Sequence, residues 1–169
     1  MGNIAILYED MNDWDSHPGV TRQERVFLLV EDNPEDAFQM EMELARIPGC
    51  RLCIVKDGQQ ALDYLAGHPP YYNNRHEFPL PDLILLDLKM PLLDGFEVLK
   101  WLRAQPQDDV AATPIIIISS SDSREDVRRA YKLGANFYLS KPLNLAAFSE
   151  SIRLLGMVWG EDAEILKHA

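Results

Sequence analysis

Long apolar runs are missing from this chain of 169 residues. A membrane-spanning helix needs about 20 predominantly apolar residues in a row, and no stretch approaches that length. The first residues include Glu9 and Asp10, and they have neither the basic region nor the small-residue cleavage site of a secretory signal. We therefore expect a cytoplasmic protein that does not bind membranes.

Positive charge is also scarce. The chain has 16 lysine and arginine residues against 27 aspartate and glutamate residues, which gives a formal net charge of -11 at pH 7. The basic residues form no stripe that could follow a phosphate backbone, and the negative surplus repels such a backbone. We expect no nucleic acid among the partners of this protein.

Only two cysteines are present, Cys50 and Cys53, and their C-x-x-C spacing is compatible with a redox pair or half of a metal site. They fall at the start of a predicted strand, however, where a spacing of three sends the two side chains to opposite faces. No second cysteine pair exists, and the four histidines show no ligand spacing. We expect two small buried cysteines without redox or metal chemistry.

The composition that is present, 47% hydrophobic residues, suits one ordinary core. Residues 1–24 have no sustained periodicity, and their charged side chains are five acids against one arginine, which predicts an acidic N-terminal arm. From residue 25 onward, apolar runs alternate with amphipathic stretches. We expect one folded domain over residues 25–160 and a C-terminal tail over residues 161–169.

Short apolar runs predict five strands, and stretches with helical periodicity predict five helices between and after them. The helix that follows the first strand is expected to bury residues up to Ile47, and the fourth helix is expected to bury Tyr131. Residues 67–81 form a long insertion rich in proline, asparagine and tyrosine. The predicted strands cover residues 26–30, 51–56, 83–86, 115–118 and 137–140, and the predicted helix caps include Asn33, Asp94, Ser123 and Asn144.

Strands that are apolar throughout indicate a parallel sheet covered on both faces, which is a doubly wound α/β fold. In such a sheet, ligands bind beyond the carboxyl ends of the strands. Polar side chains follow four of the five predicted strands and should therefore meet at one rim. These residues are Glu31, Asp32, Asp87, Ser119 and Lys141.

Three carboxylates at one rim repel one another unless a cation neutralises them. Oxygen ligands favour a hard divalent ion, and few protein donors favour Mg²⁺. An ionised aspartate beside Mg²⁺ can attack phosphorus and form an acyl phosphate. The charge of Lys141 and the hydroxyl of Ser119 could then bind the phosphoryl oxygens.

This combination of motifs resembles the receiver domains of two-component response regulators. The resemblance covers residues 25–155 and implies a flavodoxin-like sheet with strand order 2-1-3-4-5 and five helices. The motifs that carry it are Glu31-Asp32, Asp87 followed by Met90-Pro91 and Asp94-Gly95, then Ser119, Tyr138 and Lys141-Pro142.

The resemblance implies that Asp87 accepts a phosphoryl group from a histidine kinase. It further implies that Mg²⁺ is held by Asp32, Asp87 and the backbone carbonyl of Lys89, with Glu31 acting mostly through water. An aspartate-nucleophile phosphatase is disfavoured, because such enzymes carry a second acid at the position of Lys89.

The resemblance also implies a switch. In similar proteins the hydroxyl at Ser119 moves toward the phosphate, and the aromatic ring at Tyr138 then turns inward and remodels the face made by the last two helices. The bond between Lys141 and Pro142 resembles the cis peptide of the family.

About ten residues follow the last predicted helix, too few for an output domain, so we expect output through protein–protein interaction. A second apolar edge on that helix and apolar residues in the tail predict a homodimer. The insertion and the C-terminal extension resemble response regulators that partner phytochrome-type photoreceptor kinases. A receiver-like adaptor that works without phosphorylation remains an alternative. The residues expected in the dimer interface are Leu154, Val158, Ile165 and Leu166.

Overall fold

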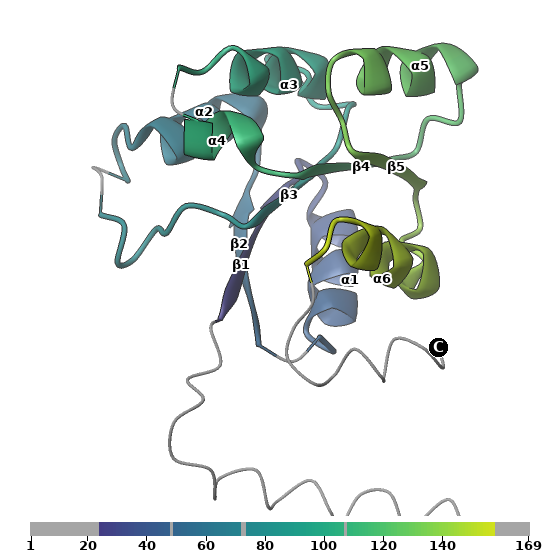
Figure 1. Ribbon diagram of the computed structural model, residues 1–169, viewed down its shortest axis with the longest axis horizontal. Helices are drawn as coiled ribbons and strands as arrows, with labels where there is room; N and C mark the ends of the chain where they lie inside the picture. Colours follow the sequence, from purple (N-terminus) through teal and green to yellow (C-terminus); the bar gives the residue numbers. More distant parts are fainter. Residues whose placement is uncertain (1–23, 48, 72–73, 107, 158–169) are drawn as a thin grey trace, which may run out of the picture.

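Five parallel strands form one sheet in the order β2-β1-β3-β4-β5 (Figure 1). The computed structural model describes residues 24–47, 49–71, 74–106 and 108–157. The sheet order and the doubly wound, flavodoxin-like architecture predicted from the sequence are confirmed. The strands are β1 (Arg25–Val30), β2 (Cys50–Val55), β3 (Leu83–Leu86), β4 (Ile115–Ser119) and β5 (Phe137–Ser140).

Helices cover both faces of this sheet. The first and last helices lie on one face, and the others lie on the opposite face or at its border (Figure 1). Each face is packed as a separate hydrophobic cluster, because neighbouring residues of a strand point in opposite directions. The helices are α1 (Pro34–Leu44), α2 (Gly58–Ala66), α3 (Gly95–Arg103), α4 (Asp108–Ala112), α5 (Arg124–Lys132) and α6 (Leu145–Leu154).

The predicted caps are present at the beginnings of these helices. Asn33, Ser123 and Asn144 each accept a hydrogen bond from a backbone N–H of the first turn that they precede. Asp94 and Glu97 form the reciprocal capping box at the start of α3. Local side-chain chemistry therefore determines where these helices begin.

The predicted number of five helices is wrong, since the described residues contain six. The additional helix, α4, has only five residues and is too short to show a helical period in the sequence. The helices predicted as fourth and fifth are therefore α5 and α6. The strand β2 also begins at Cys50, one residue earlier than predicted, and ends before Lys56.

Two residues predicted to face inward from helices behave differently. Tyr131 is 47% exposed, because α5 lies beside the partly exposed edge strand β5 and buries only a narrow stripe around Ala130. Ile47 lies beyond the end of α1, although it still packs partly buried against the core. The helical repeat of the sequence thus predicted too wide a buried stripe on α5 and too long a buried stripe on α1.

The two cysteines lie on opposite faces of β2, as predicted. Cys53 packs against one hydrophobic cluster and Cys50 against the other, and both thiols are free. They are only half-buried, not fully buried as expected, because β2 is an edge strand. Burial raises the pKa of the Cys50 thiol to about 12, which disfavours the reactive thiolate at neutral pH.

The insertion after α2 folds back onto that helix through an aromatic cluster. The ring of Tyr64 lies 5.1 Å from Tyr71 and 6.1 Å from Phe78, in edge-to-face geometry. Arg75 donates hydrogen bonds to the carbonyl groups of Tyr64 and Leu65 at the end of α2. This insertion is therefore attached to the domain and lies away from the rim described below.

Arg103 connects three segments that the sequence does not obviously link. Its guanidinium group donates to the carbonyl groups of Ala111, Thr113 and Gly134 and to Oδ1 of Asn136. The same Asn136 oxygen accepts a hydrogen bond from the first residue of β4. The end of α3, the end of α4 and the turn before β5 are thus held together by one side chain.

Arg103→Ala is expected to lower the free energy of unfolding by about 2–3 kcal/mol, because several partly buried carbonyl groups lose their donor. Urea denaturation measures this loss. Arg128→Ala, which removes an exposed arginine of α5, should change stability by less than about 0.5 kcal/mol. Equal stabilities of the two variants would contradict the structural role of Arg103.

Several predictions fall outside the described residues. These are the acidic arm, apart from Glu24, the tail, and the side chains of Val158, Ile165 and Leu166. The predicted limits of the arm, domain and tail stay predictions. Among the helices that the structure describes, none has the length and apolar character needed to cross a membrane.

Candidate functional site

The parallel register places two acidic residues side by side at one rim of the sheet. Val30 of β1 pairs with Leu86 of β3, so the residues that follow, Glu31 and Asp87, leave the sheet at the same level. The Asp87 N–H donates to the carbonyl oxygen of Val30 at 3.1 Å. Both carboxyl groups are buried, although each belongs to a residue type that is normally exposed.

Asp32 completes a group of three carboxylates. One oxygen atom from each of Glu31, Asp32 and Asp87 lies within 4.8 Å of the other two. Asp32 is the least buried of the three. The sequence prediction that these acids meet at the rim is therefore realised in the geometry.

Lys141 reaches the same rim from the end of β5. Its backbone N–H donates to the carbonyl oxygen of Ser119 at 3.0 Å, which continues the pairing of β4 with β5. The peptide bond between Lys141 and Pro142 is cis, as the family resemblance implied. The side chain is only 12% exposed.

The ammonium group of Lys141 touches three carboxylates at once. Nζ lies 2.6 Å from Oε2 of Glu31, 2.8 Å from Oδ2 of Asp87 and 2.8 Å from Oδ2 of Asp36. Burial by itself lowers the pKa of Lys141, but the contacts with these three carboxylates outweigh it and raise the pKa above its usual value. Lys141 is therefore charged in this arrangement.

Burial has the opposite consequence for Glu31. It raises the pKa of this carboxyl group, and the proximity of Asp87 adds to the rise, while Lys141 opposes both. With Asp32 and Asp36 included, four carboxylates face one ammonium group. When all four carboxylates are ionised, the carboxylates and the ammonium group together have a formal charge of about -3. This negative surplus favours a further cation in the group.

The donor set fits a hard divalent ion. All the side-chain donors are carboxylate oxygens, which Mg²⁺ prefers. Opposite ligands of Mg²⁺ lie about 4.2 Å apart, since each bond is about 2.1 Å long. The three carboxylate oxygens lie within 4.8 Å of one another, close enough to share one ion.

The loop after β3 closes around the backbone of Asp87. Lys89 donates its N–H to Oδ1 of Asp87 at 3.2 Å, and Gly95 donates its N–H to the carbonyl oxygen of Leu88 at 3.1 Å. A β-carbon at Gly95 would overlap the carbonyl oxygen of Asp87. The Asp94-Gly95 motif thus combines a helix cap with a close backbone approach that only glycine permits.

Ser119 and Tyr138 lie farther along the same rim. Ser119 is fully buried at the end of β4, and its Oγ accepts a hydrogen bond from the N–H of Ser121 at 3.3 Å. Tyr138 is half-buried, and its hydroxyl donates to the carbonyl oxygen of Ser121 at 2.8 Å. The loop after β4 therefore connects the two residues predicted to form the switch.

Sequence reasoning missed Asp36. This residue lies in the first turn of α1, and its contact with Lys141 spans 105 positions in the chain. The sequence did contain a signal for Asp36. This residue lies on the predicted helix that starts at the rim, four positions after Asp32. An acidic first turn is, however, also a common stabilising feature of helices, so this signal was not specific.

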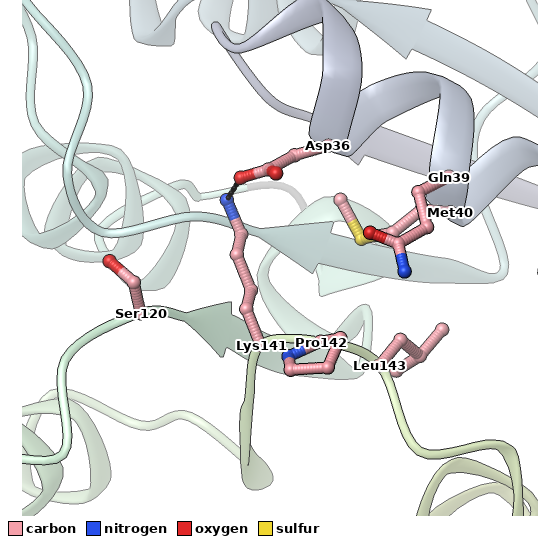
Figure 2. Close-up of a pocket in the computed structure, with 7 residues that line it drawn as sticks. All are labelled: Asp36, Gln39, Met40, Ser120, Lys141, Pro142 and Leu143. Carbon is pink, nitrogen blue, oxygen red and sulfur yellow. Dashed lines mark hydrogen bonds and ion pairs between the residues drawn. The ribbon is translucent and has the colours of Figure 1, made fainter.

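A hollow of about 320 Å³ opens beside Lys141, between α1 and the loop after β5 (Figure 2). Figure 2 shows the carboxylate of Asp36 directed toward Nζ of Lys141 across this hollow. The hollow lies beside the contact between Asp36 and Lys141. Its lining residues are Asp36, Gln39, Met40, Ser120, Lys141, Pro142 and Leu143.

Comparison with known proteins identifies the family. The model of the response regulator receiver domain matches residues 27–153. The probable methanogenesis regulatory protein FilR2 of Methanothrix harundinacea is 33% identical over 135 residues, which are 79% of this chain and 83% of FilR2. Response regulator Rcp1 of Synechocystis sp. is 34% identical over 139 residues, which are 81% of this chain and 90% of Rcp1.

Solved structures agree with this assignment. The Mn²⁺-bound form of Rcp1 matches with a TM-score of 0.63 and 33% identity, over 86% of this chain and 96% of Rcp1. The phosphorylated cyanobacterial phytochrome response regulator RcpA matches with a TM-score of 0.66 and 31% identity, over 82% of this chain and 95% of RcpA.

The resemblance inferred from the motifs is thus confirmed, including the similarity to phytochrome-associated single-domain response regulators. The matched region contains all the rim residues described above. The chain belongs to the response regulator receiver family of two-component signalling, whose members are signalling phosphoacceptors rather than enzymes.

Proposed function

We propose that this protein receives a phosphoryl group on Asp87 from the phosphohistidine of a sensor histidine kinase and passes the signal on by binding another protein. The observation that carries this proposal is the position of the Asp87 carboxylate. It lies between Nζ of Lys141, at 2.8 Å, and the N–H of Lys89, at 3.2 Å, beside two further carboxylates. Burying an aspartate among other charges at the end of a strand lowers the stability of the fold. Such a position therefore indicates a functional role for the carboxylate.

The proposed transfer forms one bond and breaks one. A carboxylate oxygen of Asp87 attacks phosphorus, and the phosphorus–nitrogen bond of the phosphohistidine breaks as the new phosphorus–oxygen bond forms. The imidazole leaves with the electron pair and takes up a proton. Lys141 and Ser119 are proposed to bind the phosphoryl oxygens through the ammonium group and the hydroxyl.

We further propose Mg²⁺ as the ion of this site, held by Asp32, Asp87 and the backbone carbonyl of Lys89, with Glu31 contributing through water. When bound, the ion would offset negative charge on the transferring phosphoryl group. The spacing of the carboxylate oxygens supports a divalent ion, and the homologue Rcp1 has a Mn²⁺-bound form. The carbonyl of Lys89 is placed in this role by family resemblance alone.

The proposed switch involves Ser119 and Tyr138. The loop after β4 contacts both residues, because Ser121 donates its N–H to Ser119 and accepts a hydrogen bond from the hydroxyl of Tyr138. Movement of the Ser119 hydroxyl toward a phosphoryl group would break its hydrogen bond with this loop. Rearrangement of that loop would reach α5, which begins just after it. The surface made by α5, β5 and α6 is therefore proposed to report the phosphorylation state.

Phosphorylation can be tested with acetyl phosphate, which transfers its phosphoryl group and releases acetate. Wild-type protein with millimolar Mg²⁺ should gain the mass of one phosphoryl group in intact-mass spectrometry, and excess EDTA should prevent the gain. Absence of labelling in folded protein, with Mg²⁺ present, would favour the alternative of a receiver-like adaptor that acts without phosphorylation.

The kinase partner is proposed to be a phytochrome-type photoreceptor kinase. The similarity to Rcp1 and to the phytochrome response regulator RcpA supports this partner, whereas FilR2 is similarly related and is described as a methanogenesis regulator. Phosphotransfer profiling against purified kinases tests the choice. Preferential labelling by a kinase of another type would contradict it. The cytoplasmic location expected from the sequence stays a prediction.

A homodimer through α6 and the tail is proposed for the output surface. Leu154 on α6 is 58% exposed, which supports an apolar contact there. Multi-angle light scattering at micromolar concentration should show a particle of about twice the chain mass of 19.3 kDa. A particle of one chain mass, with and without beryllofluoride, would contradict the dimer.

A further inference from the structure

The ammonium group of Lys141 is in contact with three carboxylates in this structure. It donates hydrogen bonds to Oδ2 of Asp36 and Oδ2 of Asp87 at 2.8 Å each, and it forms an ion pair with Oε2 of Glu31 at 2.6 Å. A phosphoryl oxygen that binds Lys141 must therefore compete with these carboxylates for the ammonium group. The burial of the three carboxylates determines which of them can give way.

The three carboxylates differ in how easily they can lose the lysine. The side chains of Glu31 and Asp87 are 0% and 6% exposed, so each would leave a buried charge behind. The Asp36 side chain is 35% exposed and stands on the first turn of α1, at the hollow shown in Figure 2. Asp36 can turn to water at little cost.

We infer that Asp36 is a positioning residue that holds Lys141 in the unphosphorylated protein and competes with the phosphoryl group for the ammonium group of Lys141. This inference rests on the proposed function and adds a regulatory role for a residue outside the proposed acceptor and metal set. Asp36 also puts a negative charge beside Lys141, the residue proposed to bind the anionic phosphoryl group. Both effects weaken phosphoryl binding.

Beryllofluoride, a non-covalent stand-in for the phosphoryl group, tests the inference without a transfer step. Isothermal titration in the presence of Mg²⁺ would compare wild type with Asp36→Asn. The variant replaces the charged acceptor of Lys141 with a weaker, neutral amide oxygen and removes one negative charge, so its dissociation constant should be about fivefold lower.

Two matched variants separate the contact from general charge. Glu35→Gln removes the same charge from the same turn, but Glu35 is not among the ion-pair partners of Lys141, so its affinity should stay within about twofold of wild type. Asp36→Glu keeps a carboxylate within reach of Nζ and should bind as wild type does. Circular dichroism verifies that each variant is folded.

The outcomes are distinguishable. Tighter binding confined to Asp36→Asn supports the inference. Equal affinities of Asp36→Asn and Glu35→Gln, weaker binding by Asp36→Asn than by wild type, or tight binding by Asp36→Glu would each overturn it. Failure of wild type itself to bind beryllofluoride with Mg²⁺ would instead refute the proposed function, and the inference with it.

Discussion

Asp87→Asn is expected to abolish phosphoryl labelling by acetyl phosphate in Mg²⁺. The amide has nearly the shape of the carboxylate, so the fold should persist, but it is uncharged and a poor nucleophile. It also removes one of the three carboxylates that lie within 4.8 Å of one another, which should weaken Mg²⁺ binding. Intact-mass spectrometry would show the mass gain in wild type and none in the variant.

Asp94→Asn is the matched control for this experiment. Asp94 is the next aspartate along the chain and caps α3, a role that asparagine fulfils equally well. This variant should be labelled as wild type is. Labelling of Asp87→Asn to the wild-type extent would show that another residue accepts the phosphoryl group.

Lys141→Ala is expected to lower the free energy of unfolding by about 3 kcal/mol in EDTA, because it leaves buried carboxylates without their cation. Glu31 and Asp87 are the groups affected most, since both side chains are almost inaccessible. Millimolar Mg²⁺ should restore part of the loss by supplying positive charge to the same group. Urea denaturation with EDTA and with Mg²⁺ measures both effects.

Lys89→Ala provides the comparison for the loss at Lys141. Lys89 is exposed at the same rim, and its backbone N–H, which the substitution keeps, makes the contact with Asp87. Its stability in EDTA should stay within about 0.5 kcal/mol of wild type. If both lysine variants were equally stable in EDTA, the compensation of buried charge by Lys141 would be disproved.

Much of the fold follows from local features that a sequence displays directly. The four consecutive isoleucines of β4 and the continuous apolar run of β3 predict strands covered on both faces, and both strands are completely buried. Helix starts at Asn33, Asp94, Ser123 and Asn144 could be predicted because the capping side chains act within three residues.

The errors arise where tertiary context determines the outcome. Tyr131 is apolar enough for a core, but α5 at the sheet edge buries too little surface to include it. The half-buried state of Cys50 and Cys53 depends on β2 being an edge strand of the sheet in the described part of the chain. The links made by Arg103 to distant carbonyl groups have no local signature at all.

The type of candidate site, a group of acids at one rim of the sheet, was easier to predict from the sequence than the individual contacts within it. Parallel strands bring their carboxyl ends to one rim, so the proximity of Glu31 and Asp87 follows from strand ends alone. The contact between Asp36 and Lys141 could not be predicted from the sequence, because it depends on how far the Lys141 side chain reaches from the end of β5 toward the first turn of α1. The roles of Ser119, Tyr138 and the Lys89 carbonyl stay predictions drawn from family resemblance.

The central claim is that the acidic rim accommodates a divalent cation which allows Asp87 to bind a phosphoryl group. A crystal structure of the protein grown with Mg²⁺ and beryllofluoride is the most direct test. We predict Mg²⁺ among the oxygens of Asp32 and Asp87, and beryllium bonded to a carboxylate oxygen of Asp87, with Nζ of Lys141 against a fluorine. Crystals from saturating Mg²⁺ and beryllofluoride with neither group at this rim would contradict the claim.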